Sequence, residues 1–515
     1  MKGPVLGIDL GTKNALCALT DGSGAPVVIP GRWGKRTTPS VAAWTESGWV
    51  AGEAALAGEM KRPHSTWRDL KRKLGTNWRG RCGRASVNAE EAIAPLLALL
   101  REDGEAYAGV FLESCVLAVP ASFSFAERSA MARAARSAGF VRIRMVNEPT
   151  AAALAYGERG RVLILDYGAG TVDLSVVESG EGVCQVLESG GLPSCGGWDF
   201  DAILAMHLAD RAGMEKTGRD SPRFRMLLSE AEEIKIALSN CMSYEWIPPP
   251  GLGARPFCVS RRELEALIRP SIEKVVSLAE TFVKKHRPSR LLLVGGGSRI
   301  PLLRRALEER IAPPGRMCLS PDEAVAAGTA LYGNPGGRSR LLLDVLSEDL
   351  GILAADGAPV PLLTKGMPLP ARVEKEFVSV GRGAFSLKVF QGEGGRVIAE
   401  AGVSSARKGE AVTLAFAVDG GGLLRIDIRR ENGERAVIPP LEIGTADGWS
   451  FDGKSDEIRA LEKRFSLLSP LLTPGQQARA DVLFRTVKSL LDEGVGPEGL
   501  ESLGAMVAEM ERAVG

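Results

Sequence analysis

Short apolar runs alternate with helical patterns over roughly the first two thirds of the chain. Runs rich in apolar and β-branched residues predict strands, and apolar residues that recur every three or four positions predict helices. The predicted strands are residues 5–10, 15–20, 114–120, 162–166, 172–178 and 291–294, and the predicted helices are residues 125–138, 150–156, 229–239, 261–284, 301–311 and 322–332. This alternation is typical of α/β layers.

The pattern changes near residue 333. Gly and Pro cluster at residues 333–337, and an apolar tract at residues 341–345 follows them. From residue 351 to about residue 440, short segments of alternating polarity and Gly-rich turns predict an antiparallel β module with one buried face. Beyond residue 456 the pattern is helical again. We therefore expect an α/β domain, an apolar linker, a β module and a short helical tail.

Two segments of the α/β region repeat one plan. LGIDLGTKNALCAL and LILDYGAGTVDLSVV each read as a strand, an Asp, a Gly-containing turn and a second strand. Such a repeat predicts a duplicated fold with two facing phosphate-binding loops. Chance similarity of two Gly-rich hairpins is the alternative.

The turns and their neighbours carry the candidate chemistry. Main-chain N–H groups in a Gly-rich turn can face phosphate oxygens, although a bare turn is usually only a hairpin. Asp9, Asp166 and Asp173 lie beside the two turns, and Mg²⁺ prefers carboxylates together with water and substrate phosphates. A third Gly-rich element, VGGGSR at residues 294–299, lies between a strand and a helix and suits a nucleoside packed on exposed backbone.

Composition narrows the classes of function. Among 515 residues, 64 Lys and Arg balance 63 Asp and Glu, so the net charge provides no strong electrostatic attraction to nucleic acid or anionic lipid. Only 3 His are present, so His-based metal sites and triads are poor candidates. The 8 Cys are dispersed without a C-x-x-C pair, which predicts reduced, buried thiols. No secretory or membrane-spanning segment is evident, so we expect a cytoplasmic protein.

Several motifs together resemble those of one family. GIDLGTKN, VNEPTAAALAYG, LDYGAGTVDLSVVE, CGGWDFD, LLLVGGGSRIP and SPDEAVAAGTALYG occur in the order found in the 70-kDa heat-shock (DnaK-type) chaperones. RLLLDV resembles that family's interdomain linker, and FAVDGGGLLRIDI resembles a strand pair of its peptide-binding domain. The resemblance spans residues 3–440. It implies an α/β actin-like (ribonuclease H-like, duplicated) ATPase domain at residues 1–338, a linker at 339–346, a β-sandwich substrate-binding domain at 347–440 and a short α-helical region at 441–515.

The resemblance also implies roles for individual residues around Mg-ATP. Lys71, Glu148, Asp166 and Thr171 would be catalytic, with Lys71 stabilising the transferred phosphoryl group, and Asp9 and Asp173 would hold the hydrated metal. The residues implied to bind nucleotide are Gly11, Thr12, Lys13, Asn14, Gly168, Ala169, Gly170 and Thr171 at the phosphates, and Glu232, Lys235, Ile236, Ser239, Gly295, Gly296, Gly297, Ser298, Arg299 and Asp322 at the adenosine. Pro120, Arg128, Arg144 and Asp344 would couple the domains. Read without the motif, Lys71 is an exposed helical Lys, and Glu232 with Lys235 is a surface pair.

Four positions depart from the family pattern. Lys13 replaces a Thr and brings another cation toward the phosphates, and Ala169 replaces the middle Gly of the second turn. Tyr167 replaces a Leu, and Gly297 replaces a Ser or Gln. The β module after Gln391 is shorter than in full-length relatives, and the tail is too short for the usual lid, which weakens the case for high-affinity peptide capture.

These patterns lead to one principal hypothesis and two alternatives. The principal one is an ATP-dependent chaperone, a monomer that uses ATP/ADP and Mg²⁺, with K⁺ as an optional ion. Unfolded or client polypeptides, a J-domain co-chaperone and a nucleotide-exchange factor would be its partners. The first alternative is a client-dedicated regulatory binder with slow ATPase activity. The second is a small-molecule kinase or filament-forming ATPase on the same fold, although neither needs the linker and β module.

Overall fold

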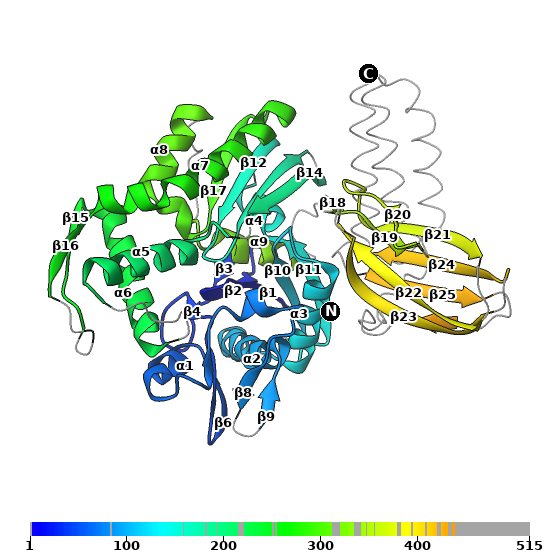
Figure 1. The fold of residues 1–515 in the computed structure, drawn as a ribbon, viewed down its shortest axis with the longest axis horizontal. Coiled ribbons are helices and arrows are strands. Elements are labelled where there is room, and N and C mark those ends of the chain that lie inside the picture. Colours follow the sequence, from blue (N-terminus) through cyan, green and yellow to red (C-terminus); the bar gives the residue numbers. More distant parts are fainter. Residues whose placement is uncertain are drawn as a thin grey trace.

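A computed structural model describes residues 3–437, except 83–84, 158, 181–182, 193, 215–220, 250–251, 253–254, 312–319, 334–340, 344, 347, 355, 379–382, 393–394, 407–408, 420–423 and 431–434. The predicted helical tail and Asp344 lie outside these residues. The described chain forms an α/β part and a separate β module beside it (Figure 1).

The first lobe of the α/β part is built on one mixed sheet. Its strand order is β11-β10-β1-β2-β3, with β4 paired to β2. β1, β10 and β11 run parallel, whereas β1, β2 and β3 form an antiparallel meander. The elements of this lobe are β1 (Val5–Leu10), β2 (Asn14–Thr20), β3 (Pro26–Val28), β4 (Thr38–Pro39), β10 (Ser114–Val119), β11 (Arg142–Asn147), α2 (Ala89–Ala108) and α3 (Phe125–Ser137).

A smaller subdomain projects from this lobe. It contains two small antiparallel sheets and short helices, which carry the segment around Lys71. Its elements are β5 (Ala42–Thr45), β6 (Gly48–Ala51), β7 (Thr66–Trp67), β8 (Gly80–Cys82), β9 (Ala85–Val87), α1 (Glu53–Ala57), η1 (Glu59–Lys61) and η2 (Leu70–Lys73).

The second lobe repeats the plan of the first. Its sheet has the order β17-β12-β13-β14-β18, with β12, β13 and β14 as an antiparallel meander and β17 parallel to β12. The predicted internal repeat is therefore a repeat of topology. The elements are β12 (Gly160–Tyr167), β13 (Val172–Ser179), β14 (Val183–Leu192), β15 (Ser243–Trp246), β16 (Phe257–Ser260), β17 (Arg290–Val294), α5 (Gly197–Arg211), α6 (Pro222–Asn240), α7 (Arg261–His286), η3 (Gly296–Arg299) and α8 (Pro301–Arg310).

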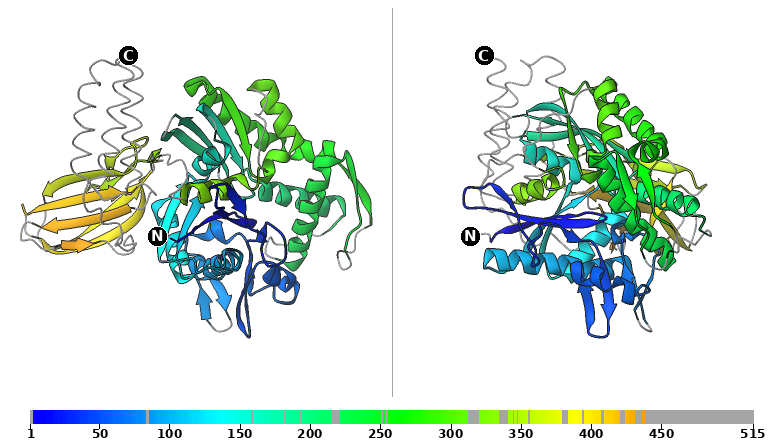
Figure 2. Two further views of the ribbon diagram at one scale, coloured as in Figure 1. Left: turned by 180° about the vertical axis from the view of Figure 1, so that it is seen from behind. Right: turned by 90° about the vertical axis from the view of Figure 1, so that its left-hand side faces the viewer.

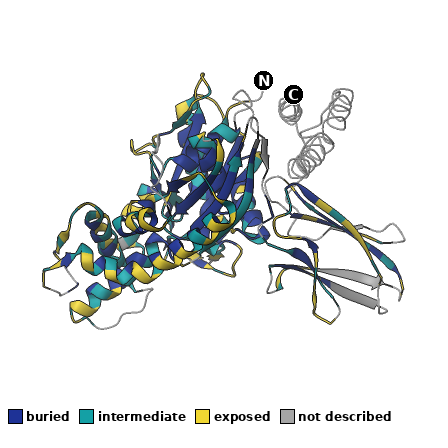
Figure 3. Ribbon diagram, turned by 90° about the horizontal axis from the view of Figure 1, so that it is seen from above, coloured by how far each residue is buried: buried dark blue, intermediate teal, exposed yellow. Residues whose placement is uncertain are grey.

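Two helices of small residues join the lobes. α4 (Glu148–Tyr156) and α9 (Ala324–Gly333) lie between the two sheets, where Ala151, Ala152 and Ala324 share a buried cluster with strand residues of both lobes. Alanine side chains allow the helices and sheets to approach closely, so this layer fixes how the lobes meet. Seen from above, buried residues concentrate in this central region and exposed residues on the outer helices (Figure 3).

The β module consists of two antiparallel sheets that share one core. The sheets have the orders β20-β19-β22-β23 and β21-β24-β25-β26, and Val389 of one sheet and Phe416 of the other belong to the same buried cluster. The strands are β19 (Leu350–Leu353), β20 (Pro359–Leu363), β21 (Ala371–Val378), β22 (Gly383–Gln391), β23 (Arg396–Ala406), β24 (Ala411–Val418), β25 (Leu424–Arg430) and β26 (Arg435–Val437).

The apolar tract between the two parts forms a strand of the second lobe. β18 (Leu341–Leu343) pairs parallel with β14, Leu342 opposite Cys184. Val345 packs in the core between the lobes, and Leu346 packs in the core of the β module. The left view of Figure 2 shows the β module beside the α/β part. The linker is thus docked in this structure.

The cysteine prediction is partly wrong. The seven described Cys are free, and five of them are buried, but Cys241 is half-buried and Cys258 is exposed on β16. Within the described residues, no helix combines the length and apolar character needed to cross a membrane.

Candidate functional site

The two Gly-rich turns predicted from the repeat meet at one place. The turn after β1 contains Gly11, Thr12 and Lys13, and the turn after β12 contains Gly168–Thr171. A Cβ atom on Gly170 would lie only 2.4 Å from Oγ1 of Thr12, so the turns touch and no side chain fits between them. The two turns, one from each lobe, are thus in contact.

Acidic side chains and one Lys gather beside these turns. Asp9 lies on β1, and Asp166 and Asp173 are cross-strand neighbours on β12 and β13. Glu148 is the first residue of α4 and is buried. Its Oε1 accepts a hydrogen bond from Nζ of Lys71, which η2 carries and which is 6% exposed. The structure therefore brings together these five residues from both lobes.

This crowding changes the ionisation of the carboxyl groups. Burial, reinforced by the charge of Glu148, raises the pKa of Asp9 to about 7 and that of Asp173 to about 6. The pKa of Asp166 is raised well above its usual value for the same reasons. Burial alone lowers the pKa of Lys71, but Glu148, Asp9 and Asp166 outweigh it and the pKa is raised. Lys71 therefore stays positively charged, whereas ionising the neighbouring Asp side chains costs free energy in the folded protein.

Hydroxyl groups hold one of these acids. Oγ of Ser122, in the loop before α3, donates to Oδ1 of Asp173 at 3.1 Å, and Thr171 also hydrogen-bonds the Asp173 carboxylate. Both bonds favour the ionised form, which is the form that binds a cation. Among the described residues, no group of three or more acidic, Cys or His side chains is arranged to hold a metal alone. Two carboxylates with water and phosphate oxygens remain the suitable set for Mg²⁺.

The expected adenosine residues fall into two separate groups. On α6, Nζ of Lys235 donates to the carbonyl of Gly197 (2.9 Å) and pairs with Oδ1 of Asp201 (2.7 Å). The side chain of Ile236 is 56% exposed and offers an apolar surface, and Ser239 bonds the carbonyl of Lys235 one turn earlier.

The second group lies at the end of β17. Gly295 and Gly296 begin the turn into η3, and the buried Ser298 donates to the carbonyl of Gly295. Nη2 of Arg299 donates to Oδ2 of Asp322 at 2.6 Å. Asp322 also contributes to the raised pKa of Asp9, which places this group near the acidic cluster.

The side chain of Lys13 departs from its expected position. The sequence predicts that it lies toward the phosphates, but its Nζ pairs with Asp201 on α5 (3.3 Å) and with Glu232 on α6. Two carboxylates of the second lobe attract the ammonium group away from the turn. A cavity of about 270 Å³ adjoins this contact, between Trp67 of the first lobe and Trp198 of the second.

A hydrogen-bonded route leads from the β module toward Glu148. The main-chain N–H of Phe125, at the start of α3, donates to Oε1 of Gln391 on β22 (3.2 Å), and the Phe125 side chain packs in the core of the β module. Three residues further along α3, Arg128 donates to Oδ1 of Asn147 at 2.6 Å and, more weakly, to the carbonyl of Pro120. Asn147 directly precedes Glu148 in the chain.

Arg144 contacts the end of α9 within the described residues. Its Nη2 donates to the carbonyls of Tyr332 (3.2 Å) and Gly333 (3.4 Å), and its guanidinium lies 4.8 Å from the Tyr332 ring centroid. The expected partner, Asp344, lies outside the described residues.

Several residues at the site were not anticipated from the sequence. Asp201 stands in the motif CGGWDFD, so a signal was present, but its partners Lys13 and Lys235 are remote in sequence. Ser122 and Phe125 lie in the segment VPASFSFAER between Pro120 and Arg128, so a signal was present there as well, whereas Gln391 carries no motif. Their contacts arise only from the packing of α3 against its neighbours.

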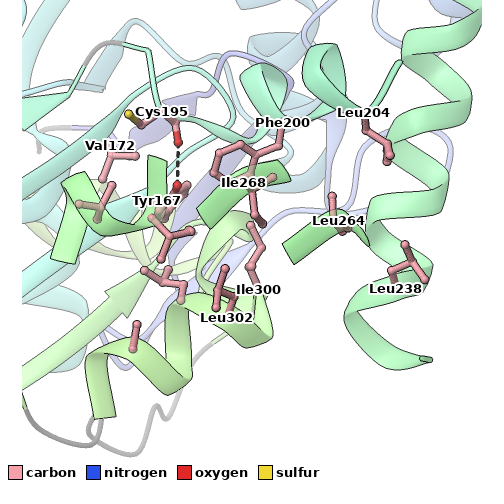
Figure 4. Close-up of a cluster of buried hydrophobic side chains, with 14 of the residues drawn as sticks. Tyr167, Val172, Cys195, Phe200, Leu204, Leu238, Leu264, Ile268, Ile300 and Leu302 are labelled. Carbon is pink, nitrogen blue, oxygen red and sulfur yellow. Dashed lines mark hydrogen bonds between the residues drawn. The ribbon is translucent and has the colours of Figure 1, made fainter. Parts of the chain in front are cut away.

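Tyr167 and Gly297, two residues that depart from the family pattern, lie against each other. A Cβ atom on Gly297 would lie 2.2 Å from Cδ1 of Tyr167, so the Tyr ring fills the position of a side chain there. The ring is fully buried, and its hydroxyl donates to the carbonyl of Cys195 at 2.7 Å (Figure 4). The larger residue at 167 and the missing side chain at 297 therefore compensate each other.

Two α/β lobes of one topology, with matching turns in contact and a β module attached through a paired strand, define the architecture. The family described as "Hsp70 protein" matches residues 5–85 and 79–437. The chaperone protein DnaK of Thermotoga petrophila and that of Thermotoga maritima are each 33% identical to this chain, over 82% of it and 78% of their own length. That of Thermotoga neapolitana is 32% identical over the same shares.

The chain belongs to the Hsp70 family. Membership supports, in general terms, an ATP-binding chaperone that acts in protein folding.

The Tyr167–Gly297 pair can be tested by replacing each residue alone and then both together. Gly297→Ser alone should displace the Tyr ring and lower the free energy of unfolding by about 1–3 kcal/mol, the usual cost of overpacking. Tyr167→Leu alone should also destabilise, because it leaves a void and an unpaired carbonyl. The double variant should be more stable than the sum of the two effects predicts, as urea denaturation would measure. Strictly additive losses would contradict the pairing.

The acidic cluster predicts a pH dependence of stability. Without nucleotide or Mg²⁺, ionising Asp9 costs free energy only in the folded state, so stability should fall as pH rises from about 4 to about 7. The fall at pH 7.5 relative to pH 5 should exceed about 1.4 kcal/mol, the equivalent of one pKa unit. Asp9→Asn should reduce this fall in parallel urea titrations. An unchanged difference between the two pH values would show that Asp9 is not the source.

Proposed function

We propose that this chain is an ATP-dependent chaperone in which hydrolysis of Mg-ATP controls the holding and release of apolar peptide segments. Residues 1–338 would form an actin-like ATPase domain, 339–346 the linker, 347–440 the substrate-binding β-sandwich, and 441–515 a short C-terminal region. The observation that carries the proposal is the Lys71–Glu148 pair among Asp9, Asp166 and Asp173, beside two turns in contact.

The two turns suit the binding of phosphates. Main-chain N–H groups of residues 11–14 and 168–171 would surround the β- and γ-phosphates from opposite lobes, as amides in tight turns do. Asp9 and Asp173 would hold hydrated Mg²⁺, which supplies positive charge to the phosphate oxygens. The raised pKa values of both acids fit this assignment, because a bound cation would favour their ionised forms.

The buried Lys would act on the transferred phosphoryl group. Lys71 stays charged because of its neighbours, and a buried cation interacts strongly with charge that develops on phosphate oxygens. Glu148 fixes the position of its Nζ. Glu148 and Asp166 would also orient the attacking water, and Thr171 would position Asp173. Positioning and electrostatics supply most of the catalysis in this type of reaction.

Glu232, Lys235, Ile236 and Ser239 on α6 would hold the adenosine from one side. The second group, Gly295, Gly296, Gly297, Ser298, Arg299 and Asp322, would hold it from the other.

The β module would signal to this site through α3. A change in its position alters the Gln391–Phe125 bond at the start of α3. The same helix carries Arg128, whose partner Asn147 precedes the catalytic Glu148. Pro120, Arg144 and Asp344 would contribute to the same coupling. Client peptides, a J-domain co-chaperone and a nucleotide-exchange factor would be the partners.

One observation favours a second candidate function. Lys13 joins the lobes by ion pairs, which would slow the cycle of nucleotide binding and release. A client-dedicated binder with slow ATPase activity would use such a cycle. Partner binding that differs between ATP and ADP, without stimulation by general peptides, would identify it.

Replacement of Lys71 tests the ATPase assignment. Lys71→Ala should retain ATP binding but slow single-turnover hydrolysis by about 100-fold or more, the usual loss when a group that stabilises developing charge is removed. Lys71→Met with Glu148→Gln removes both charges and should be equally inactive, which guards against misfolding caused by an unpaired buried acid. Lys73→Ala, on the same short helix, should hydrolyse ATP at the wild-type rate. Wild-type turnover in Lys71→Ala would remove it from the mechanism.

Replacement of Gln391 tests the coupling. An apolar model peptide should accelerate single-turnover hydrolysis by the wild-type protein, and Gln391→Ala should lose most of that acceleration while its basal rate is kept. Lys388→Ala, exposed on the same strand, is the matched control and should respond normally. Full stimulation of Gln391→Ala would refute this route. Absence of stimulation in the wild type itself would favour the client-dedicated binder.

A further inference from the structure

Lys13 makes ion pairs that cross from one lobe to the other. It belongs to the first Gly-rich turn, whereas Asp201 lies on α5 and Glu232 on α6 of the second lobe (Figure 1). Its Nζ is 3.3 Å from Oδ2 of Asp201 and is also paired with Oε1 of Glu232. One residue of the proposed phosphate loop is therefore tied to the opposite lobe by two carboxylates.

One of these acids is fully buried, and its two partners in the contact are partly buried. The side chain of Asp201 is 2% exposed, and those of Lys13 and Glu232 are 25% exposed. Asp201 also pairs with Lys235 through its other oxygen, so two Lys and two acids alternate in one network. An acid as buried as Asp201 needs its cationic partners, because water does not replace them.

Other contacts between the lobes surround the same cavity. Nη1 of Arg225 on α6 donates to the carbonyl of Pro63 at 2.6 Å, and the guanidinium of Arg72 lies 5.5 Å from the ring of Trp198. Arg225, Trp198, Lys13 and Glu232 all line this cavity. Among these contacts between the lobes, only those of Lys13 involve a residue of the turn that is proposed to bind phosphate.

We propose that Lys13 is an interlobe latch that controls entry and release of the nucleotide. The lobes cannot separate while its ammonium group is bound to Asp201 and Glu232. The latch therefore closes the cleft, whether empty or occupied, and retards both binding and dissociation. This inference rests on the nucleotide site proposed above and goes beyond it, because it assigns Lys13 to gating.

The first experiment measures opening in the nucleotide-free, full-length protein. Cys258 is exposed on the second lobe and Glu46 is exposed on the first, so spin labels at Cys258 and at Glu46→Cys report the distance between lobes. Cys241 and Cys318 are changed to Ser to avoid extra labels. Lys13→Thr should lengthen and broaden the distance distribution. Lys73→Thr also removes a cation of the cavity wall, but its Nζ contacts Arg68 and Trp78 of its own lobe, so the distances should be unchanged.

The second experiment measures dissociation of a fluorescent ADP analogue by stopped flow. Lys13→Thr should accelerate dissociation about three- to fivefold, the range for an ion pair partly open to solvent, and Lys73→Thr should not. Asp201→Asn should accelerate it too, and adding Lys13→Thr to Asp201→Asn should have less effect than in the wild-type background.

The outcomes separate the latch from the ATPase proposal. Unchanged distances in Lys13→Thr overturn the latch, whether or not ADP binds. Unchanged dissociation, or equal acceleration in Lys73→Thr, overturns its control of exchange. Failure of the wild-type protein to bind ADP would refute the proposed ATPase function, while the distance measurement would still decide whether Lys13 closes the cleft.

Discussion

The structure depends on one buried cation among several acids. Lys71 neutralises Glu148, but Asp9, Asp166 and Asp173 lie in the same region and none of them has a cation of its own that offsets its burial. The free protein accommodates this by favouring protonated carboxyl groups. A bound cation with a phosphate ligand would remove that strain, so the cluster is unfavourable for folding and favourable for binding. The two sheets, whose equivalent strands deliver these acids to one place, make this arrangement achievable.

The position of Glu148 connects the cluster to the rest of the molecule. It begins α4, the small-residue helix that packs with α9 between the lobes, and it follows Asn147, the partner of Arg128. The coupling proposed through α3 would therefore act on the residue that holds Lys71. The start of α3 is bonded to Gln391, and β18 joins the same β module to the second lobe. The β module thus contacts the first lobe directly and is connected to the second lobe through the linker strand β18.

Local patterns predicted much of the fold and less of the site. β1 was predicted at its observed limits, and β12, β13 and α7 within two residues at each end, because buried strands and amphipathic helices have strong periodicity. α2 was missed although Asn88 and Glu91 form a capping box at its start. The internal repeat predicted the two facing turns and the three Asp beside them, whereas Lys71 and Glu148 could be added only because their motifs resemble a family. The partners of Lys13 could not be predicted, since its ion pairs join positions 188 residues or more apart.

The departures from the family pattern are explained by their neighbours. Tyr167 requires Gly297, since the ring occupies the space of any side chain there. Lys13 requires acids on the opposite lobe, and Asp201 and Glu232 supply them. In the first case a change in volume is balanced inside one lobe, so its effect is on stability. In the second a charge is balanced across the cleft, so its effect must appear whenever the lobes move. The effect of a substitution at the cleft of this chain therefore depends on which lobe carries the residue that compensates for it. Its distance from the phosphate-binding turns is a poorer guide.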